Sequence, residues 1–587
     1  MKTINMQKGF NLQNETGKLA QNIADNWLIG LRETNPAILD MFHERDKKPY
    51  RDLLPWSGEF AGKYITGAYY IYKLTHDDIL YKYIMNFIDE LLDCIDEDGY
   101  IGCYSKECHL TGAFSQNPSI LGGTWDAWSN YHVMYGLFMW YIETKQQRLF
   151  DAVEKIAGLF LKTFYDGGLR LVDIGSTEMN LAPLHIFTML YLKTKDERYL
   201  SFVREIEKDL STPNAGNYIE HSLKGLEYFE CPKPRWESLH VIMGIALMGE
   251  CTNNQKYYEA SKQIFYSILK TDIHNTGGFS TEEQAIGNPF VNGNVELCCV
   301  IAYNAFACDM LKLTGDMKIA DFLELSLYNA VMGSFSPTGA WSTYNTPMEG
   351  IKNANYHSIV FQSRSGSPNL NCCSVNAARG VGMLSEWAFM QENATVYINY
   401  FENCALTTHE GLEIKIIGEY PVSPDVQITL KSTDKQRIAI RIPLWSAHTT
   451  ITVQGKTEIA KNGEYFYLDT INNVETIEIH FDFTPHFVEG ANAYQGKKSI
   501  YVGPILYGYD LSLDRTHGVL EHRVQPHINS ALDFDNLPSI SVFDLKKAVP
   551  FRRTDGHIIL NLSNITLCDF YHLGVTGSQY KTWFTCE

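Results

Sequence analysis

Long apolar stretches, rich in aromatic residues, alternate with short polar breaks over roughly the first two thirds of the chain. A threonine followed by polar residues recurs at these breaks, and an amphipathic stretch follows each one. The breaks are Leu74-Thr75-His76-Asp77, Glu143-Thr144-Lys145-Gln146, Lys193-Thr194-Lys195-Asp196, Cys251-Thr252-Asn253-Asn254 and Leu313-Thr314-Gly315-Asp316. Their spacing of about fifty to seventy residues is the length of a two-helix hairpin with its connecting loops. The pattern predicts five helical hairpins, with apolar helices that end at the threonines.

A sixth hairpin can be completed by the segment from Ala377 to Leu384, which has the composition of another helix start. Six hairpins pack economically as an all-α (α/α)6 toroid with the apolar helices inside. We assign residues 10–388 to this toroid. An open helical solenoid is the alternative that helix counting alone leaves open.

Beyond about residue 394 the hydrophobic pattern changes to period two, which is typical of half-buried strands. The clearest predicted strands are Val396–Tyr400, Gln427–Leu430, Ile438–Pro443 and Thr476–Phe481, and short turns such as Lys461-Asn462-Gly463 separate them. We expect an all-β sandwich over residues 389–510. Residues 511–587 form a second sandwich or extend the first, and residues 1–9 are an N-terminal extension with the option of adding a strand to this region.

Charge and composition restrict the partners. The 49 Lys and Arg residues stand against 68 Asp and Glu residues, which gives a formal net charge of −19. Phosphate backbones and anionic lipid surfaces repel such a chain, so we expect neither nucleic acid nor membrane partners. Aromatic residues make up 13% of the chain and offer flat faces for the C–H surfaces of sugars, which favours a small oligosaccharide or glycoside. The chain is compatible with a homodimer but does not require one.

The cysteines indicate a reducing compartment. Thirteen are scattered along the chain, an odd number that suits free thiols better than a disulfide framework. The first residues contain no apolar core of a secretory signal, and no segment approaches the roughly twenty apolar residues of a membrane span. We therefore expect a cytoplasmic protein.

Four residues in two clusters have the chemistry of a metal site. Cys372 and Cys373 are adjacent, and they follow a Glu296-Leu297-Cys298 tripeptide by about seventy residues; three thiols and one carboxylate make a complete tetrahedral zinc shell. Both clusters lie at predicted helix starts, where Asn292-Gly293-Asn294 would cap the first helix and place Glu296 and Cys298 in its first turn. A large helical domain needs no metal for stability, so a catalytic thiolate on zinc is the leading hypothesis. Inert buried cysteines are the alternative.

Eight short strings together carry a family resemblance that covers nearly the whole chain. They are Trp56-Ser57-Gly58-Glu59-Phe60-Ala61-Gly62-Lys63, Asp98-Gly99-Tyr100-Ile101-Gly102, Thr276-Gly277-Gly278-Phe279, Glu296-Leu297-Cys298, Leu327-Tyr328-Asn329, Cys372-Cys373, Arg441-Ile442-Pro443-Leu444-Trp445 and Gly503-Pro504-Ile505-Leu506-Tyr507. In order and spacing the chain resembles glycoside hydrolase family 127, the β-L-arabinofuranosidase-like proteins. The resemblance implies an (α/α)6 catalytic domain followed by β-sandwiches. It also implies a retaining exo-glycosidase that releases a terminal furanose, most simply β-L-arabinofuranose or a related pentose.

The resemblance further implies roles for particular residues. Cys372 corresponds to a zinc-bound nucleophile, and Glu296, Cys298 and Cys373 correspond to the other zinc ligands. A retaining mechanism needs a carboxylic acid as well, and the family's glutamate falls in the interval Glu282-Glu283-Gln284. We assign this acid/base role to Glu283 by its position and keep Glu282 as the alternative. Ser374-Val375 replaces the paired prolines common in the family.

Further residues are candidates for sugar binding. Trp125, Asp126 and His132 precede or open a predicted inner helix, and His240 matches a family position near the pocket; packing in the core is the alternative for each. Two other functions stay open. One is a metal-independent sugar epimerase, lyase or unsaturated-uronide hydrolase that uses Asp126, His132 or His240. The other is a non-catalytic carbohydrate-binding protein with structural zinc.

Overall fold

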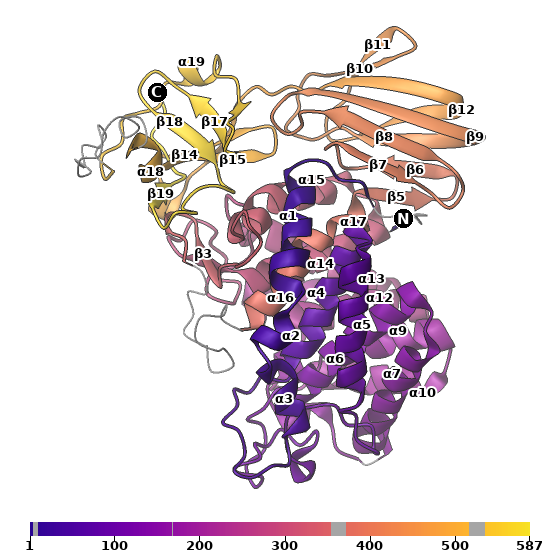
Figure 1. The fold of residues 1–587 in the computed structure, drawn as a ribbon. Coiled ribbons are helices and arrows are strands. Elements are labelled where there is room, and N and C mark those ends of the chain that lie inside the picture. Colours follow the sequence, from indigo (N-terminus) through magenta and orange to yellow (C-terminus); the bar gives the residue numbers. More distant parts are fainter. Residues whose placement is uncertain (4–9, 167, 354–370, 516–533) are drawn as a thin grey trace.

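A helical region precedes a β-rich C-terminal region in the computed structural model of the protein (Figure 1). The structure describes residues 1–3, 10–166, 168–353, 371–515 and 534–587. Residues 4–9 of the predicted N-terminal extension and residues 516–533 of the last predicted segment lie outside the described residues.

Six helices of the helical region contact one another in a closed cycle, in which each touches the next and the last touches the first. In order they are α4 (Glu59–Thr75), α6 (Asp126–Thr144), α9 (Pro183–Thr194), α12 (Ser238–Thr252), α14 (Leu297–Thr314) and α16 (Cys372–Gly382). We call these the inner helices. An outer helix packs against each of them, in the order α5 (Asp78–Leu92), α7 (Gln147–Phe160), α10 (Glu197–Leu210), α13 (Gln255–Thr271), α15 (Met317–Ser326) and α1 (Glu15–Ile23). The five predicted hairpins are therefore present.

The threonine breaks are helix ends with a common set of hydrogen bonds. The Thr75 hydroxyl donates to the carbonyl of Ile71 at 3.0 Å and accepts the N–H of Asp77 at 3.3 Å. His76 between them adopts a left-handed conformation, with φ at 48°, and the chain reverses. Asp77 then caps α5 by accepting the N–H of Leu80 at 2.9 Å. The same bond from the threonine hydroxyl to the carbonyl four residues earlier forms at Thr144, Thr194, Thr252 and Thr314.

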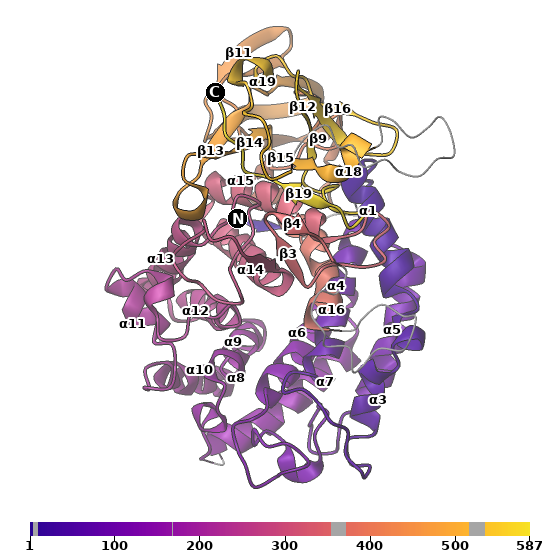
Figure 2. The ribbon, with the colours of Figure 1, turned by 90° about the vertical axis from the view of Figure 1, so that its left-hand side faces the viewer.

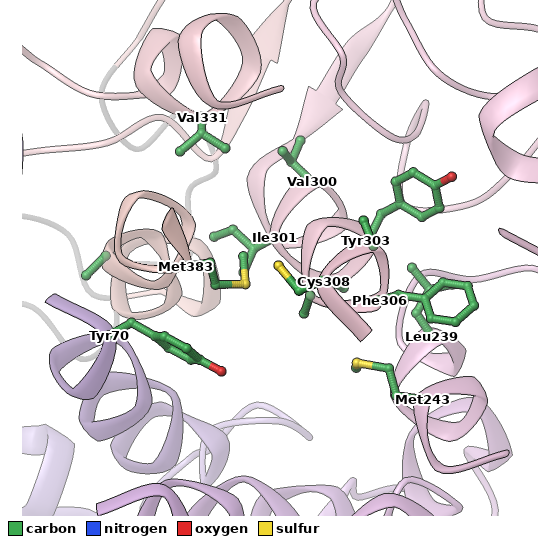
Figure 3. Close-up of a cluster of buried hydrophobic side chains, with 14 of the residues drawn as sticks. Tyr70, Leu239, Met243, Val300, Ile301, Tyr303, Phe306, Cys308, Val331 and Met383 are labelled. Carbon is green, nitrogen blue, oxygen red and sulfur yellow. The ribbon is translucent and has the colours of Figure 1, made fainter. Parts of the chain in front are cut away.

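The apolar core runs between the inner helices. Figure 3 shows α14 side chains such as Val300, Ile301 and Phe306 between Leu239 and Met243 of α12 on one side and Met383, just past α16, on the other. Among the described residues, α14 is the one helix long and apolar enough to cross a membrane by length and composition, contrary to the sequence-based expectation. Its 18-residue span is 78% buried within the protein, as a central core helix would be.

Two large sheets lie on one side of the helical region (Figure 2). In the first, strands follow one another in the order β1 (Lys2–Thr3), β5 (Phe389–Glu392), β6 (Thr395–Ile398), β9 (Asp425–Arg441), β12 (Tyr465–His480), β10 (Thr449–Val453) and β11 (Lys456–Ala460); β8 (Glu413–Gly418) pairs with β9, and β7 (Cys404–Thr407) pairs with β8. Only the pairing of β6 with β9 is parallel among the described strand pairs of this sheet. The predicted strands at 427–430 and 438–443 are thus parts of one long strand.

The second sheet has the order β13 (His486–Glu489), β14 (Lys498–Val502), β15 (Ile505–Asp510), β18 (Thr566–Asp569), β17 (Ile558–Asn561) and β16 (Phe551–Arg552); β19 (Gln579–Lys581) pairs with β15, and β4 (Gly350–Ile351) pairs with β19. The domain boundary placed at residues 510 and 511 therefore runs through a single sheet. Short helices connect the larger elements: α2 (Leu31–Thr34), α3 (Ala37–His43), α8 (Thr177–Asn180), α11 (Tyr218–Leu223), α17 (Leu384–Trp387), α18 (Leu511–Arg515) and α19 (Val542–Leu545).

Buried polar contacts join the sheets to the helices. Arg441, at the end of β9, is fully buried and forms ion pairs with Asp321 at 2.5 Å and Glu324 at 2.6 Å, both on α15. The Asn329 amide donates to the carbonyl of Pro504 at 2.9 Å and accepts the N–H of Leu506 at 2.9 Å. Three of the strings that carry the family resemblance thus form the junction between the helical and β-rich regions.

Candidate active site

The four candidate metal ligands lie at the beginnings of two neighbouring inner helices. Glu296 ends the short strand β2 (Asn294–Glu296), which pairs with β3 (Asn345–Pro347), and it occupies the N-cap position of α14. Cys298 is the second residue of that helix. The prediction that Asn292-Gly293-Asn294 caps the helix was wrong, because the chain continues as a strand up to Glu296 and the period of so short a segment is ambiguous.

Cys372 and Cys373 are the first two residues of α16, as the prediction of a helix start requires. The Asn371 side chain accepts the N–H of Ser374 at 3.0 Å, and the Ser374 hydroxyl accepts the N–H of Asn371 at 2.9 Å. This reciprocal pair is a capping box. Ser374 therefore fixes the turn that presents both cysteines.

The side-chain ligand atoms of Glu296, Cys298, Cys372 and Cys373 all lie within 4.8 Å of one another, and all four residues are buried. The Cys373 thiol donates to Glu296 Oε1 at 3.5 Å. Ligands bonded to one tetrahedral zinc ion at about 2.3 Å lie about 3.8 Å apart, so small side-chain shifts bring this set to coordination distance. Three sulfurs and one carboxylate oxygen are also a donor set that zinc accepts. The site could therefore hold a metal ion.

The negative charge of this cluster lies mainly on the Cys298 sulfur. Burial raises the pKa of the Cys298 thiol, but hydrogen bonds from Cys372 and Cys373 and the charge of Lys63 outweigh it and lower the pKa to about 6. The hydrogen bond to Cys298, followed by burial, raises the pKa of Cys372 to about 12. Burial raises the pKa of Glu296 well above its ordinary value. Because only a cation would allow all four groups to be anionic together, the cluster has the electrostatics of a metal site.

Glu283 lies beside this cluster. The Tyr344 hydroxyl accepts the Cys372 thiol proton at 3.4 Å and lies 3.5 Å from Glu283 Oε1, to which it donates. One phenol therefore contacts both the predicted nucleophile and the predicted acid/base residue. The side chain of Glu282, in contrast, is exposed. This geometry favours Glu283 over Glu282.

An ion-pair network fixes the position of the Glu283 carboxylate. Arg235 Nη2 lies 2.8 Å from Glu283 Oε2 and 2.7 Å from Glu237 Oε1. The N–H of Trp236 also donates to the backbone carbonyl of Glu283 at 3.1 Å. Glu282 and Glu283 both adopt positive φ angles, of 49° and 72°, which are unusual for residues with a side chain. Consecutive residues in this region are strained, and such strain gathers at functional sites.

The predicted sugar-binding residues divide into two groups. His132 and His240 lie close together, with ring centroids 5.2 Å apart, and both stack edge-on against Trp128. Burial, followed by nearby positive charge, lowers the pKa of both imidazoles well below the ordinary value, so both are neutral. The Tyr131 hydroxyl joins His240, at 2.7 Å, to His185, at 2.9 Å. Neutral imidazoles on three inner helices are suited to hydrogen-bonding hydroxyl groups.

Trp125 and Asp126 have other neighbours. Asp126 is fully buried and accepts the Tyr100 hydroxyl at 2.9 Å and the N–H of Leu110 at 2.8 Å. Trp125 packs against Trp56, with ring centroids 5.0 Å apart. Within the described residues, neither side chain has a hydrogen bond to the thiol cluster. Asp126 therefore holds a loop in place, and this disfavours the alternative in which it acts as a catalytic acid or base.

Four residues of the site escaped the sequence analysis as individual candidates: Lys63, His185, Arg235 and Tyr344. Two had a usable signal. Lys63 closes the first string of the family resemblance and follows Glu59 by one helical turn. His185 occupies the third position of α9, as His240 does in α12. Arg235 and Tyr344 are in loops, where the sequence has no periodicity to indicate the direction of a side chain.

Comparisons with known proteins agree with this fold and site. The family described as "Beta-L-arabinofuranosidase, GH127 catalytic domain" matches residues 11–386, and the family described as "Beta-L-arabinofuranosidase, GH127 middle domain" matches residues 395–483. The protein is thus an enzyme of the glycoside hydrolase class. Within that class, the chain belongs to glycoside hydrolase family 127.

Solved structures share the fold over the whole chain. A GH127 β-L-arabinofuranosidase from Geobacillus stearothermophilus T6, Ara127N, is 15% identical with a TM-score of 0.77, over 99% of this chain and all of its own. The GH127 β-arabinofuranosidase BT3674 is 18% identical with a TM-score of 0.74, over 100% of this chain and 98% of its own. No curated protein matches the chain significantly. At these identities the structures show a shared fold.

Proposed function

We propose that the protein is a retaining exo-glycosidase that releases a terminal furanose, β-L-arabinofuranose or a related pentose, with Cys372 as nucleophile and Glu283 as acid/base. One observation carries this proposal: the Tyr344 hydroxyl lies 3.4 Å from the Cys372 sulfur and 3.5 Å from the Glu283 carboxylate. A retaining glycosidase needs a nucleophile and a carboxylic acid close together around the scissile bond. The family supports the choice of sugar.

Exposure supports Cys372 as the attacking thiol. It is 5% exposed, whereas Cys298 and Cys373 are fully buried. The Cys298 sulfur contacts the Lys63 ammonium and the Asn376 amide, and the Cys373 sulfur contacts Glu296. The Cys372 sulfur contacts the phenol of Tyr344, which also contacts Glu283. The Cys372 sulfur is therefore the one placed to meet a sugar.

Zinc is the ion we assign to the thiol cluster, with Glu296, Cys298, Cys372 and Cys373 as ligands. When bound, zinc supplies positive charge that keeps the sulfurs deprotonated at neutral pH, so no general base is needed to make a thiolate. The beginning of α16 adds to this effect, because the backbone N–H groups at a helix start favour an anion at Cys372.

The reaction then has two steps in which the same residues exchange roles. In the first, the Cys372 thiolate forms a C–S bond to the anomeric carbon while the C–O bond to the leaving group breaks, and the Glu283 carboxylic acid gives its proton to the departing oxygen. In the second, the Glu283 carboxylate takes a proton from water, the water oxygen bonds to the anomeric carbon, and the C–S bond breaks. The thiolate and the acid are both regenerated. Two inversions retain the anomeric configuration.

Neutral imidazoles supply the sugar pocket in this proposal. His132, His185 and His240 each come from a different inner helix and converge around Tyr131 and Trp128. The Nε2 atom of His132 is buried and has no hydrogen-bond partner among the described residues. A furanose hydroxyl would satisfy it. The closed cycle of inner helices that presents these residues supports the assignment of the helical region as an (α/α)6 toroid.

A panel of aryl β-L-arabinofuranosides, other aryl furanosides and aryl pyranosides tests this function. We expect turnover of the arabinofuranoside, with NMR at early times showing the product in the retained configuration. Cys372→Ser should abolish turnover, whereas Cys308→Ser, a matched change of a buried thiol on α14, should leave it within a few-fold. An inverted first product, or full activity of the Cys372 variant, would refute the mechanism.

A further inference from the structure

A buried lysine lies beside the thiol cluster. Lys63 on α4 places its ammonium 3.9 Å from the Cys298 sulfur and 2.8 Å from Glu59 Oε1. The side chains of Lys63 and Glu59 are each 1% exposed. A lysine is almost never this deeply buried unless its charge has a partner. The partners here are a carboxylate of its own helix and a sulfur of another.

The surroundings of Lys63 hold its ammonium in place. The Trp236 and Trp128 rings lie 5.0 Å and 5.6 Å from the ammonium, within the range of cation–π contacts. The Trp128 indole N–H also donates to Glu59. If Lys63 served only to pair with Glu59, its ammonium would not also need to reach across to α14. The contact with Cys298 therefore calls for a role at the thiol cluster.

The charge of the metal centre provides that role, on the basis of the proposed function. Three thiolates and one carboxylate carry four negative charges, and zinc supplies two positive charges, so a loaded centre keeps a net charge of −2 in a buried place. A buried charge without an opposite charge nearby destabilises the folded protein. Within the described residues, Lys63 is the one Lys or Arg side chain with a hydrogen bond to any of the three sulfurs.

We propose that Lys63 is a positioning residue of the metal centre: its ammonium is the counter-charge that stabilises the Cys298 thiolate and thereby sets the affinity for zinc. Glu59 and the two indole rings orient the ammonium. Removal of partners that support metal ligands typically lowers metal affinity about 10- to 100-fold. The proposal therefore concerns metal binding first and turnover only as a consequence.

The test compares zinc binding by the full-length wild-type protein with that of Lys63 variants. Metal content is measured after purification, and affinity is measured by competition with a chromophoric chelator. Lys63→Met, which keeps the apolar stem, should weaken zinc binding about 10- to 100-fold. Lys63→Arg, which keeps the charge, should recover most of the affinity. Lys73→Met is the matched control, because Lys73 lies at the far end of α4 and pairs with Glu143 instead; it should bind zinc as the wild type does.

A second variant separates the proposed role from folding. Lys63→Met leaves Glu59 buried without its partner, whereas the double variant Glu59→Gln with Lys63→Met removes both charges of the pair. We expect the double variant to fold and still bind zinc weakly. Wild-type affinity in Lys63→Met or in the double variant would overturn the role of Lys63 and leave the proposed function intact. A wild-type protein that takes up no zinc would overturn the role of Lys63 and the assignment of zinc, whereas the turnover of Cys372→Ser tests the nucleophile separately.

Discussion

Arg235 is the residue whose removal tests the site's electrostatics most directly. Its guanidinium donates to Glu237 Oε1 at 2.7 Å, to Glu237 Oε2 at 3.1 Å and to Glu283 Oε2 at 2.8 Å. The Glu237 side chain is 1% exposed and the Arg235 side chain 30% exposed. Arg235→Met keeps much of the apolar stem and removes the charge and every donor. The change therefore leaves one buried and one partly buried carboxylate without their partner.

The expected loss of stability depends on pH. Removing one partner of a buried pair costs about 3–5 kcal/mol, and we take about 3 kcal/mol because water reaches part of Arg235. Burial raises the pKa of Glu237 from 4.5 to about 7, although the hydrogen bonds and charge of Arg235 act in the opposite direction. A carboxyl whose pKa is raised by folding stabilises the protein below pH 4.5, and this contribution is lost as the pH rises through 7. Without Arg235 the ionised Glu237 carboxylate has lost its partner, so the loss of stability is greater. The variant is therefore least stable above pH 7.

The assay is urea unfolding followed by tryptophan fluorescence, with each variant compared with the wild type at the same pH. We expect Arg235→Met to be destabilised by about 3 kcal/mol at pH 8 and by less than half of that at about pH 4.5. Arg198→Met is the control, because Arg198 forms an exposed pair with Asp196 and should change stability by less than about 1 kcal/mol. Equal destabilisation at both pH values would refute the assignment of the effect to Glu237.

Four further outcomes test the catalytic groups and the metal. Glu283→Gln should slow alkyl glycosides about 10²- to 10⁴-fold and aryl glycosides much less, measured as kcat for each leaving group, because aryl groups depart with little protonation. Glu282→Gln should resemble the wild type; if it shows the leaving-group effect instead, the acid/base role belongs to Glu282. Tyr344→Phe should lower kcat about 10-fold, because the hydroxyl that contacts both Cys372 and Glu283 is lost, and an unchanged kcat would remove Tyr344 from the site. Prolonged chelation should abolish turnover of the same glycosides, and full activity in metal-free protein would exclude the metal.

The helical hairpins could be predicted from the sequence because their ends are set locally. At Thr75 and its counterparts a hydroxyl, a left-handed residue and a capping side chain lie within a few positions of one another. The strands were predicted less well. The predicted strand at 427–430 and most of the one at 438–443 belong to one strand, β9, because pairing with β12 continues past the polar residues between them through two register shifts. Polarity marks a turn only where no neighbouring strand pairs with the backbone.

The site could be predicted only in part, because its residues meet through long-range packing. Adjacent cysteines at a helix start were recognisable, but no local pattern shows that α14 and α16 lie side by side. Tyr344 reaches Cys372 because β3 pairs with β2, which ends at Glu296. Arg235 reaches Glu283 through the contact of two loops. These contacts form only in the tertiary structure. The residue types of Tyr344 and Arg235 do not by themselves indicate that the two residues belong to the site.

The start of each inner helix is where the protein places its chemistry. Every one of the six contributes a residue of the site from its first two turns: Lys63, His132, His185, His240, Cys298 and Cys372. Backbone N–H groups at a helix start are unpaired and carry partial positive charge, so they favour thiolates and carboxylates within the first turn. The opposite ends of five of these helices are occupied by threonine turns that only reverse the chain. At the thiol cluster the starts of α14 and α16 meet, and the ammonium of Lys63 from α4 adds a full positive charge beside those partial charges.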